Sequence, residues 1–163
     1  MSSLEQLTPL PDHGSCFICG DENPKNLGIK WYRDKREDGS LMIVTEFTFD
    51  IHQQGPPMHA HGGASAAVLD EAMGVVAWQS GLQVVLANMS LDYRRPVPLN
   101  QQVRVEAWVK DRTERKVFTY ARLMLPDGKT AVSGTGLYVE AAHLFENSAF
   151  ITMHQFGQQQ NSE

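Results

Sequence analysis

The sequence predicts an α+β fold in which one long buried helix is wrapped by a curved antiparallel sheet of about five to six strands. Three observations carry this prediction. Apolar and polar side chains alternate with period two in six segments of the chain. One alanine-rich segment breaks that alternation, and the order along the chain is two strands, the helix and four strands.

The six alternating segments are typical of half-buried strands, and they cover residues 27–32, 41–49, 88–93, 103–110, 117–125 and 131–140. Pro126-Asp127-Gly128-Lys129 separates the last two as a tight turn, because proline fixes φ and glycine accepts positive φ. The polar segment 111–115 is a second short connection. We therefore expect the last three strands to form an antiparallel meander.

The helix is expected over Gly63–Trp78, sixteen residues that end near Gly81. At a rise of 1.5 Å per residue it would be about 24 Å long. It is apolar on nearly all sides, which indicates burial rather than an amphipathic surface position. Its many alanines and glycines would let a sheet wrap closely around it.

Composition excludes several classes of protein. The chain has 163 residues, 42% of them hydrophobic and 20% charged, with a net charge of −5. These values indicate one globular domain rather than a disordered chain. We expect no membrane span, since no run reaches about 18 apolar residues, and no nucleic-acid partner, since there is no basic excess. A domain of this size has little room for a large cleft, which favours a site shared between subunits.

We divide the chain into an N-terminal arm (residues 1–15), one domain (16–142) and a C-terminal extension with a loose end (143–163). The N-terminus has no basic segment followed by an apolar core, so no secretory signal is expected. The only cysteines, Cys16 and Cys19, cannot form a disulfide framework. We therefore expect a cytoplasmic protein with reduced thiols.

The main anomaly is an adjacent pair of acids, Asp70 and Glu71, in the middle of the apolar helix. Neither has a basic or hydrogen-bonding neighbour three or four positions away on the helix. Carboxylates in such surroundings are candidates for a general base or a nucleophile. The alternative is that an acid faces solvent or pairs with a distant arginine. Adjacent positions differ by about 100° around a helix, so the two acids should have different surroundings.

A second anomaly is the Gly/Pro/His-rich loop at 52–63, which ends in Gly62-Gly63 at the helix start. Helix N-termini present unpaired backbone N–H groups, and glycine lets a carbonyl approach them closely. That is the geometry of an oxyanion hole. Gly62 and Asp70 are eight residues apart, about 12 Å along a helix, so spacing alone does not join them. The alternative is a plain turn that starts the helix.

We expect no metal site. His52, His59 and His61 lack the spacing that places two ligands on one helix face, and they are better explained as loop-orienting residues. Cys16-x-x-Cys19 supplies at most half of a zinc site, to which His13 and a second subunit could add ligands. The simpler interpretation is two thiols packed in a turn.

Arg94 and Arg95 lie at the end of a predicted strand, before a rigid Pro-Val-Pro loop. Two adjacent guanidinium groups can clamp a phosphate, although a solvated strand end explains the pair equally well. No glycine-rich phosphate loop is present, so side chains would have to hold any bound nucleotide.

Together these motifs resemble the hotdog-fold thioesterases, in particular the PaaI-like, 4-hydroxybenzoyl-CoA thioesterase and thioesterase-superfamily-member types. The resemblance covers roughly residues 16–140. It is carried by His61-Gly62-Gly63-Ala64 with Leu69-Asp70-Glu71-Ala72-Met73-Gly74, by Cys16-Phe17-Ile18-Cys19-Gly20, and by Tyr93-Arg94-Arg95-Pro96-Val97-Pro98. It implies a hotdog fold and a homodimer or dimer of dimers with active sites at the subunit interface.

The resemblance also implies residue roles. Asp70 would be the catalytic carboxylate, the N–H of Gly62, beside Gly63, would polarise the thioester carbonyl, and His61 would hold the loop or the substrate. Asn88 or Ser90 of a partner subunit would position water, with Glu71 as a further candidate, and Arg94 and Arg95 would hold the phosphates of coenzyme A. Relatives commonly have Asn or Gln where this chain has Gly55, and the adjacent Gln54 is the candidate replacement.

The leading hypothesis is therefore hydrolysis of an acyl-CoA thioester, with coenzyme A as part of the substrate and no separate cofactor. A non-catalytic hotdog module that binds an acyl thioester is the alternative. A hotdog hydratase or dehydratase fits less well, because no histidine follows Asp70 until His143.

Overall fold

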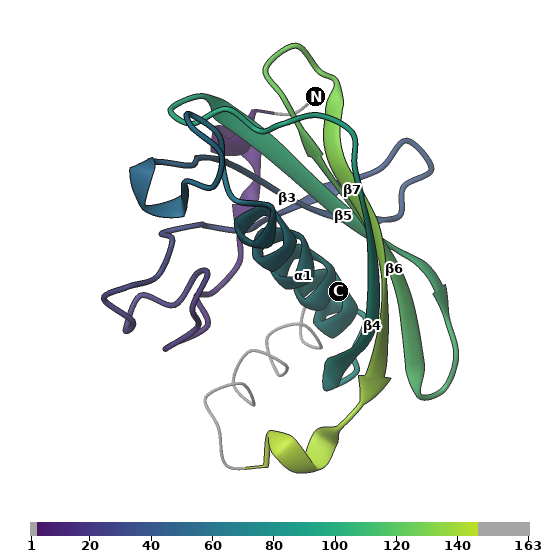
Figure 1. Cartoon of the computed structure of the whole chain (residues 1–163). Helices are drawn as coiled ribbons and strands as arrows, with labels where there is room; N and C mark the ends of the chain where they lie inside the picture. Colours follow the sequence, from purple (N-terminus) through teal and green to yellow (C-terminus); the bar gives the residue numbers. More distant parts are fainter. Residues whose placement is uncertain (1–2, 147–163) are drawn as a thin grey trace.

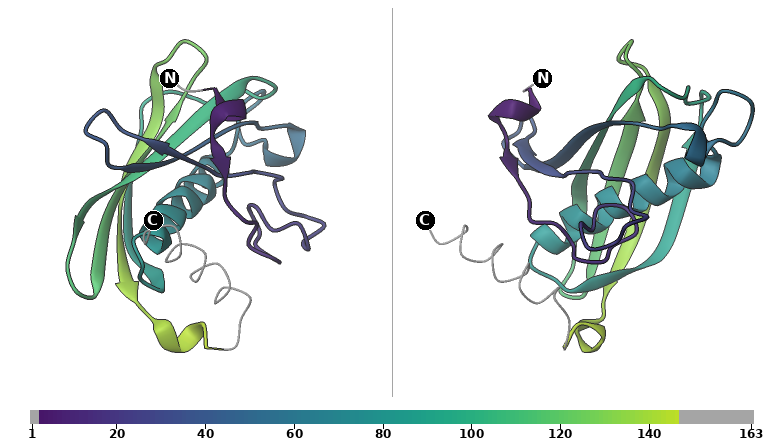
Figure 2. Two further views of the ribbon diagram at one scale, coloured as in Figure 1. Left: turned by 180° about the vertical axis from the view of Figure 1, so that it is seen from behind. Right: turned by 90° about the vertical axis from the view of Figure 1, so that its left-hand side faces the viewer.

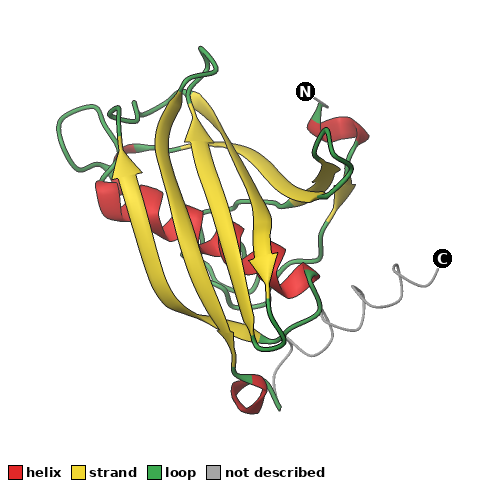
Figure 3. Ribbon diagram, turned by 90° about the vertical axis from the view of Figure 1, so that its right-hand side faces the viewer, coloured by secondary structure: helices red, strands yellow, loops and turns green. Residues whose placement is uncertain are grey.

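The computed structural model describes residues 3–146, in which helix α1 (Gly62–Gln79) lies across the concave face of a curved antiparallel sheet (Figure 1; Figure 3). The sheet has seven strands in the order β1-β2-β3-β5-β6-β7-β4. Their bounds are β1 (Thr8–Pro9), β2 (Tyr32–Lys35), β3 (Leu41–Thr48), β4 (Val84–Tyr93), β5 (Gln102–Arg112), β6 (Lys116–Met124) and β7 (Thr130–Glu140). Three short 3₁₀ turns are η1 (Leu4–Gln6), η2 (Ile51–Gln53) and η3 (Ala142–Leu144).

The predicted fold class and the order of its main elements are confirmed. The seventh strand is β1, two residues of the N-terminal arm that pair with β2. The expected meander is present, because β6 pairs with both β5 and β7. At its turn, the N–H of Leu125 donates to Lys129 O over 2.9 Å, and Gly128 has φ +78°.

The strand predicted at 27–32 is wrong, because β2 begins only at Tyr32. The alternation there does report burial: Ile29 and Trp31 are 1% and 3% exposed. Their backbone bonds go to loops instead of a neighbouring strand. The N–H of Ile29 donates to Ile18 O, and Trp31 O accepts from the N–H of Leu10.

Helix α1 is enclosed from two sides. The sheet covers one side, and the segment before β2 crosses the opposite side of the helix (Figure 2). Every residue from Ala72 to Ala77 is buried, which agrees with the all-round apolar pattern. The N-terminal half is more open, since Ala64, Ala66, Ala67 and Asp70 are only half-buried.

Strand β4 forms one edge of the sheet. It pairs with β7, and within residues 3–146 no strand pairs with its other edge. It begins four residues before the predicted start at 88, and its register with β7 shifts between Leu86 and Asn88. Strand β4 therefore runs unbroken from Val84 to Tyr93 despite this change of register.

Most of the predicted C-terminal extension, residues 147–163, lies outside the described residues. Among the described helices, none has the length and apolar character needed to span a bilayer.

Candidate active site

The start of α1 is held by His61, which is its N-cap residue. The N–H of Gly63 donates to His61 Nδ1 over 2.8 Å, and the N–H groups of Ala64 and Ser65 donate to His61 O. Because Nδ1 accepts this bond, the ring of a neutral His61 carries its proton on Nε2. The N–H of Gly62 has no hydrogen-bond partner anywhere in the described part of the chain, so one first-turn donor is free.

Gly62 also lies against the end of β4. Tyr93 donates its hydroxyl proton to Gly62 O over 2.8 Å, and a Cβ at Gly62 would lie 3.4 Å from Tyr93 Cε1. The tyrosine is 54% exposed, so this contact sits at the surface. Glycine therefore keeps the approach to the free N–H open beside the ring.

Arg94 and Arg95 follow directly and are exposed. Their backbone N–H groups donate to Ala131 O over 2.8 and 3.1 Å, which fixes the chain and leaves the side chains outside. Within residues 3–146 neither guanidinium forms an ion pair. The structure thus places two exposed cations directly after Tyr93, the residue whose hydroxyl contacts Gly62 at the start of α1.

The loop before the helix explains the unusual glycine at position 55. A Cβ at Gly55 would lie only 2.7 Å from His61 Cα, so a side chain there would push the helix cap away. The neighbouring Gln54 uses its Oε1 to accept from the N–H of Met58 over 3.0 Å. In this chain Gln54 stabilises the loop turn, while Gly55 lets that turn pack on His61.

Asp70 has a partner on the sheet that the sequence did not reveal. Tyr138 of β7 donates its hydroxyl proton to Asp70 Oδ1 over 2.7 Å. The Tyr138 hydroxyl oxygen also lies 2.8 Å from the backbone oxygen of Asp70. Tyr138 is 2% exposed, and burial together with the negative charge of Asp70 raises the pKa of its phenol. The tyrosine therefore stays a neutral hydrogen-bond donor and orients the carboxylate.

Glycines make room for this tyrosine between helix and sheet. A Cβ at Gly136 would lie 2.7 Å from Tyr138 Cε2, and one at Gly74 would lie 3.6 Å from Cε1. The pattern Gly136-x-Tyr138 opposite a helix glycine is the only sequence signal that could have indicated the contact, and it requires the strand register.

Asn88 and Ser90 are not brought to Asp70 within the chain. Met89 and Leu91 pack against the core, so the alternate residues Asn88 and Ser90 are exposed on the face of the sheet away from α1. Their role in a partner's site stays a prediction.

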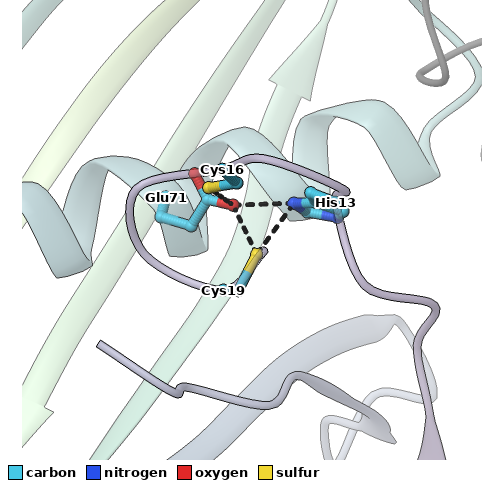
Figure 4. Close-up of side chains that lie close together, drawn as sticks. All are labelled: His13, Cys16, Cys19 and Glu71. Atoms are coloured by element: carbon cyan, nitrogen blue, oxygen red, sulfur yellow. Dashed lines mark hydrogen bonds and ion pairs between the residues drawn. The ribbon is translucent and has the colours of Figure 1, made fainter. Parts of the chain in front are cut away.

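Glu71 has entirely different surroundings from Asp70. Its Oε1 lies 2.7 Å from His13 Nδ1, 3.2 Å from Cys19 Sγ and 3.4 Å from Cys16 Sγ (Figure 4). Burial raises the pKa of the Glu71 carboxyl. Burial alone would lower the pKa of His13, but the neighbouring Cys16 and Glu71 outweigh it and raise this pKa to about 9.

These four side chains are the one group in residues 3–146 whose donor atoms could surround a metal ion. The loop histidines do not form such a group. His52 Nδ1 lies 2.9 Å from Asp50 Oδ1, and His59 Nδ1 donates to Pro57 O over 2.9 Å. Both contacts orient the loop, as expected from the sequence.

Comparison with known proteins relates this geometry to the thioesterase superfamily. The thioesterase superfamily model matches residues 58–132, which include the end of the loop before α1, the helix and strands β4 to β6. Acyl-coenzyme A thioesterase THEM4 of Rattus norvegicus is 35% identical over 103 residues, which is 63% of this chain and 42% of that protein. The chain therefore spans less than half the length of this curated relative.

Solved structures agree with the fold. A crystal structure of a thioesterase superfamily protein aligns with TM-score 0.70 and 31% identity, over 78% of this chain and 61% of that chain. A hypothetical thioesterase with coenzyme A from Streptococcus pneumoniae TIGR4 aligns with TM-score 0.61 and 17% identity, over 68% and 85% of the two chains. The expected hotdog fold and the family resemblance are thus confirmed.

Proposed function

Because residues 58–132 match the thioesterase superfamily model and the chain has a hotdog fold, we propose that this protein hydrolyses an acyl-CoA thioester to a free acid and coenzyme A. The observation that carries the proposal is that helix α1 presents both a hydrogen-bond donor for the thioester oxygen and a carboxylate that can act as a base. Its first N–H, at Gly62, is free to donate, and its central carboxylate, Asp70, is half-buried and oriented by Tyr138.

The chemistry needs an electrophile and a base. The Gly62 N–H, reinforced by the positive end of the helix dipole, donates to the thioester oxygen and stabilises the charge that develops there. Asp70 accepts a proton from water as the water oxygen bonds to the carbonyl carbon. The carbon–sulfur bond then breaks, and the proton passes to the coenzyme A thiolate. Tyr138 keeps Asp70 aimed at the water throughout.

Within one subunit, the Gly62 N–H and the Asp70 carboxylate lie too far apart to act on the same carbonyl. Gly62 and Asp70 are eight residues apart on α1, about 12 Å along the axis. We propose that the site forms in a homodimer, where Asp70 of one subunit faces the partner subunit's Gly62. The open edge of β4 supports this arrangement, because a ten-residue strand with one unpaired edge favours pairing with another chain. Two such dimers would form the tetramer.

We assign the phosphates of coenzyme A to Arg94 and Arg95. Both are exposed, lack ion pairs within residues 3–146 and directly follow Tyr93, which contacts Gly62. Guanidinium groups bind phosphates through paired hydrogen bonds. In a chain of net charge −5, binding of an anionic substrate would depend on such local cations rather than on the overall field.

The test is release of free thiol from a panel of aliphatic and aromatic acyl-CoAs by the wild-type protein and by Asp70→Asn. We expect turnover of at least one acyl-CoA and a fall of roughly 10²- to 10⁴-fold in kcat for the variant, as for loss of a general base. Asp38→Asn is the matched control, since that exposed carboxylate lies in the turn between β2 and β3, toward the other edge of the sheet from β7 and β4. It should keep the wild-type rate.

The same panel separates catalysis from binding alone. Calorimetric binding of an acyl-CoA without thiol release would support the non-catalytic module instead. Full activity in Asp70→Asn would remove the carboxylate from the mechanism.

A further inference from the structure

The contacts of Glu71 lie outside the catalytic chemistry, yet they join a histidine, two cysteines and a carboxylate whose ligand atoms all lie within 4.8 Å of one another. His13, Cys16 and Cys19 come from the segment that crosses α1, and Glu71 comes from the helix itself. We propose that these four residues bind one structural Zn²⁺ ion, which fastens this segment to the helix.

The spacing of the donor atoms fits a tetrahedral site. Bonds of about 2.3 Å to sulfur and 2.0–2.2 Å to nitrogen or oxygen place neighbouring ligand atoms about 3.3–3.8 Å apart. The four donor atoms already lie within 4.8 Å of one another. The His13–Glu71, His13–Cys19 and Cys19–Glu71 contacts measure 2.7, 3.1 and 3.2 Å. Each needs to open by less than about 1 Å to admit the ion.

The loop that carries the thiols is built to hold both sulfurs toward Glu71. The N–H of Ile18 donates to Cys16 Sγ over 3.3 Å, a contact that favours the thiolate form a metal requires. The N–H of Gly20 donates to Cys16 O over 3.0 Å. A Cβ at Gly20 would lie 2.2 Å from both Cys16 N and Gly14 O, so only glycine permits this closure. These contacts fix Cys16, and the 3.2 Å contact of Cys19 Sγ with Glu71 Oε1 holds the second thiol, before any metal binds.

The donor set selects the ion. Two thiolates with an imidazole and a carboxylate suit zinc, whereas magnesium and calcium prefer oxygen ligands alone. On binding, His13 Nδ1 and the thiols lose their protons to solvent, and the imidazole nitrogen and both sulfurs bond to the metal in place of their contacts with Glu71. Two thiolates and one carboxylate around Zn²⁺, with a neutral imidazole, then leave a net charge of −1 at the site.

Four protein ligands leave no position for a water molecule, so the ion would be structural rather than catalytic. His13 is 4% and Cys19 is 3% exposed, which keeps the site closed. The His13 ring also packs edge-on against Trp78 near the end of α1, with centroids 5.2 Å apart. The ion would therefore connect the N-terminal segment to the helix one residue from Asp70.

The proposal departs from the expectation of no metal site, because Glu71 stands 52 residues beyond Cys19 and only folding brings them together. It does not depend on the thioesterase proposal, since metal content is measured without turnover.

The experiment is metal analysis of the purified full chain, followed by cobalt substitution. We expect about one zinc per chain and, with Co²⁺ alone, a thiolate-to-cobalt charge-transfer band in the near ultraviolet. Cys19→Ser should weaken the band and lower zinc content at least tenfold. Glu22→Gln is the matched control, because Glu22 lies in the same loop but contacts Ser15 rather than the cluster. It should retain the zinc.

Alkylation of wild-type protein gives a second readout if Cys19→Ser fails to fold. Zinc should protect both thiols, and a chelator should expose them. A folded wild-type protein without zinc or a charge-transfer band, or one with a Cys16–Cys19 disulfide, would overturn the proposal. The cluster would then be a set of hydrogen-bonded side chains only.

Discussion

Asp70 and Glu71 are neighbours on one helix, yet the fold gives them different chemistry. Asp70 faces the sheet, is half-buried and receives one hydrogen bond from the neutral phenol of Tyr138. Glu71 faces the crossing segment and is surrounded by an imidazole and two thiols. A rotation of about 100° between adjacent residues places them against different elements.

The packing partner, rather than the residue type, therefore decides what a carboxylate in this helix can do. One hydrogen bond orients Asp70 and leaves its other oxygen available to a substrate or water. Three contacts on a single oxygen commit Glu71 to the cluster.

Removing zinc tests the Glu71 side. At a zinc concentration a hundredfold above the Kd, the ion would stabilise the fold by about 2.7 kcal/mol. Chelation should therefore lower the Tm by roughly 5–10 °C for a domain of this size, as measured by calorimetry. The same chelator should leave the Tm of Cys19→Ser unchanged. Equal Tm shifts in the wild-type protein and Cys19→Ser would show that the loss of stability on chelation does not arise from the four-residue cluster.

Gly55→Ala tests the loop that supports the start of the helix. The new methyl would meet the backbone of His61 at 2.7 Å, so the cap must move. Forced overpacking of this kind costs about 2 kcal/mol, and urea denaturation should show it. We also expect a lower kcat, since the Gly62 N–H is aimed by the same turn. An unchanged midpoint and rate would show that the loop does not hold His61.

Tyr138→Phe tests the Asp70 side with the ring retained. Losing a hydrogen bond to a charged group costs roughly 1.5 kcal/mol, so kcat should fall about tenfold with little change in KM. Tyr120→Phe is the control, because that tyrosine packs at a tilt against Trp108 on the opposite face of the sheet. In an Asp70→Asn background the same change should have no further effect. An additive loss would mean that Tyr138 acts independently of Asp70.

Arg94→Gln and Arg95→Gln should have the smallest effect. Exposed charges contribute about 0.2–1 kcal/mol, so each should raise the KM for acyl-CoA by up to roughly fivefold. An N-acetylcysteamine thioester, which lacks the phosphates, should show no change. Arg115→Gln serves as the control, since that exposed arginine pairs with Glu140. Equal effects on both substrates would place the arginines away from the phosphates.

Local patterns in the sequence were sufficient for the fold, the helix and the turn at Gly128, because each is determined by periodicity or backbone preference. The strand predicted from the alternation in segment 27–31 was wrong, since alternation indicates which side chains are buried and not which backbone groups form hydrogen bonds. Tyr138 and Glu71 were beyond reach for another reason. Their partners lie 68 and 58 residues away, at Asp70 and His13, so only the register and the crossing loop reveal them. The oligomer and the cytoplasmic location stay predictions.

The most direct test of the division between the two acids is one thiol-release assay of Asp70→Asn and Glu71→Gln under identical conditions. We expect kcat to fall at least a hundredfold in Asp70→Asn, as for loss of a general base. Glu71→Gln should lose less than about tenfold, because its carboxylate positions the N-terminal segment and takes no proton in the reaction. Equal losses, or a greater loss in Glu71→Gln, would contradict the account.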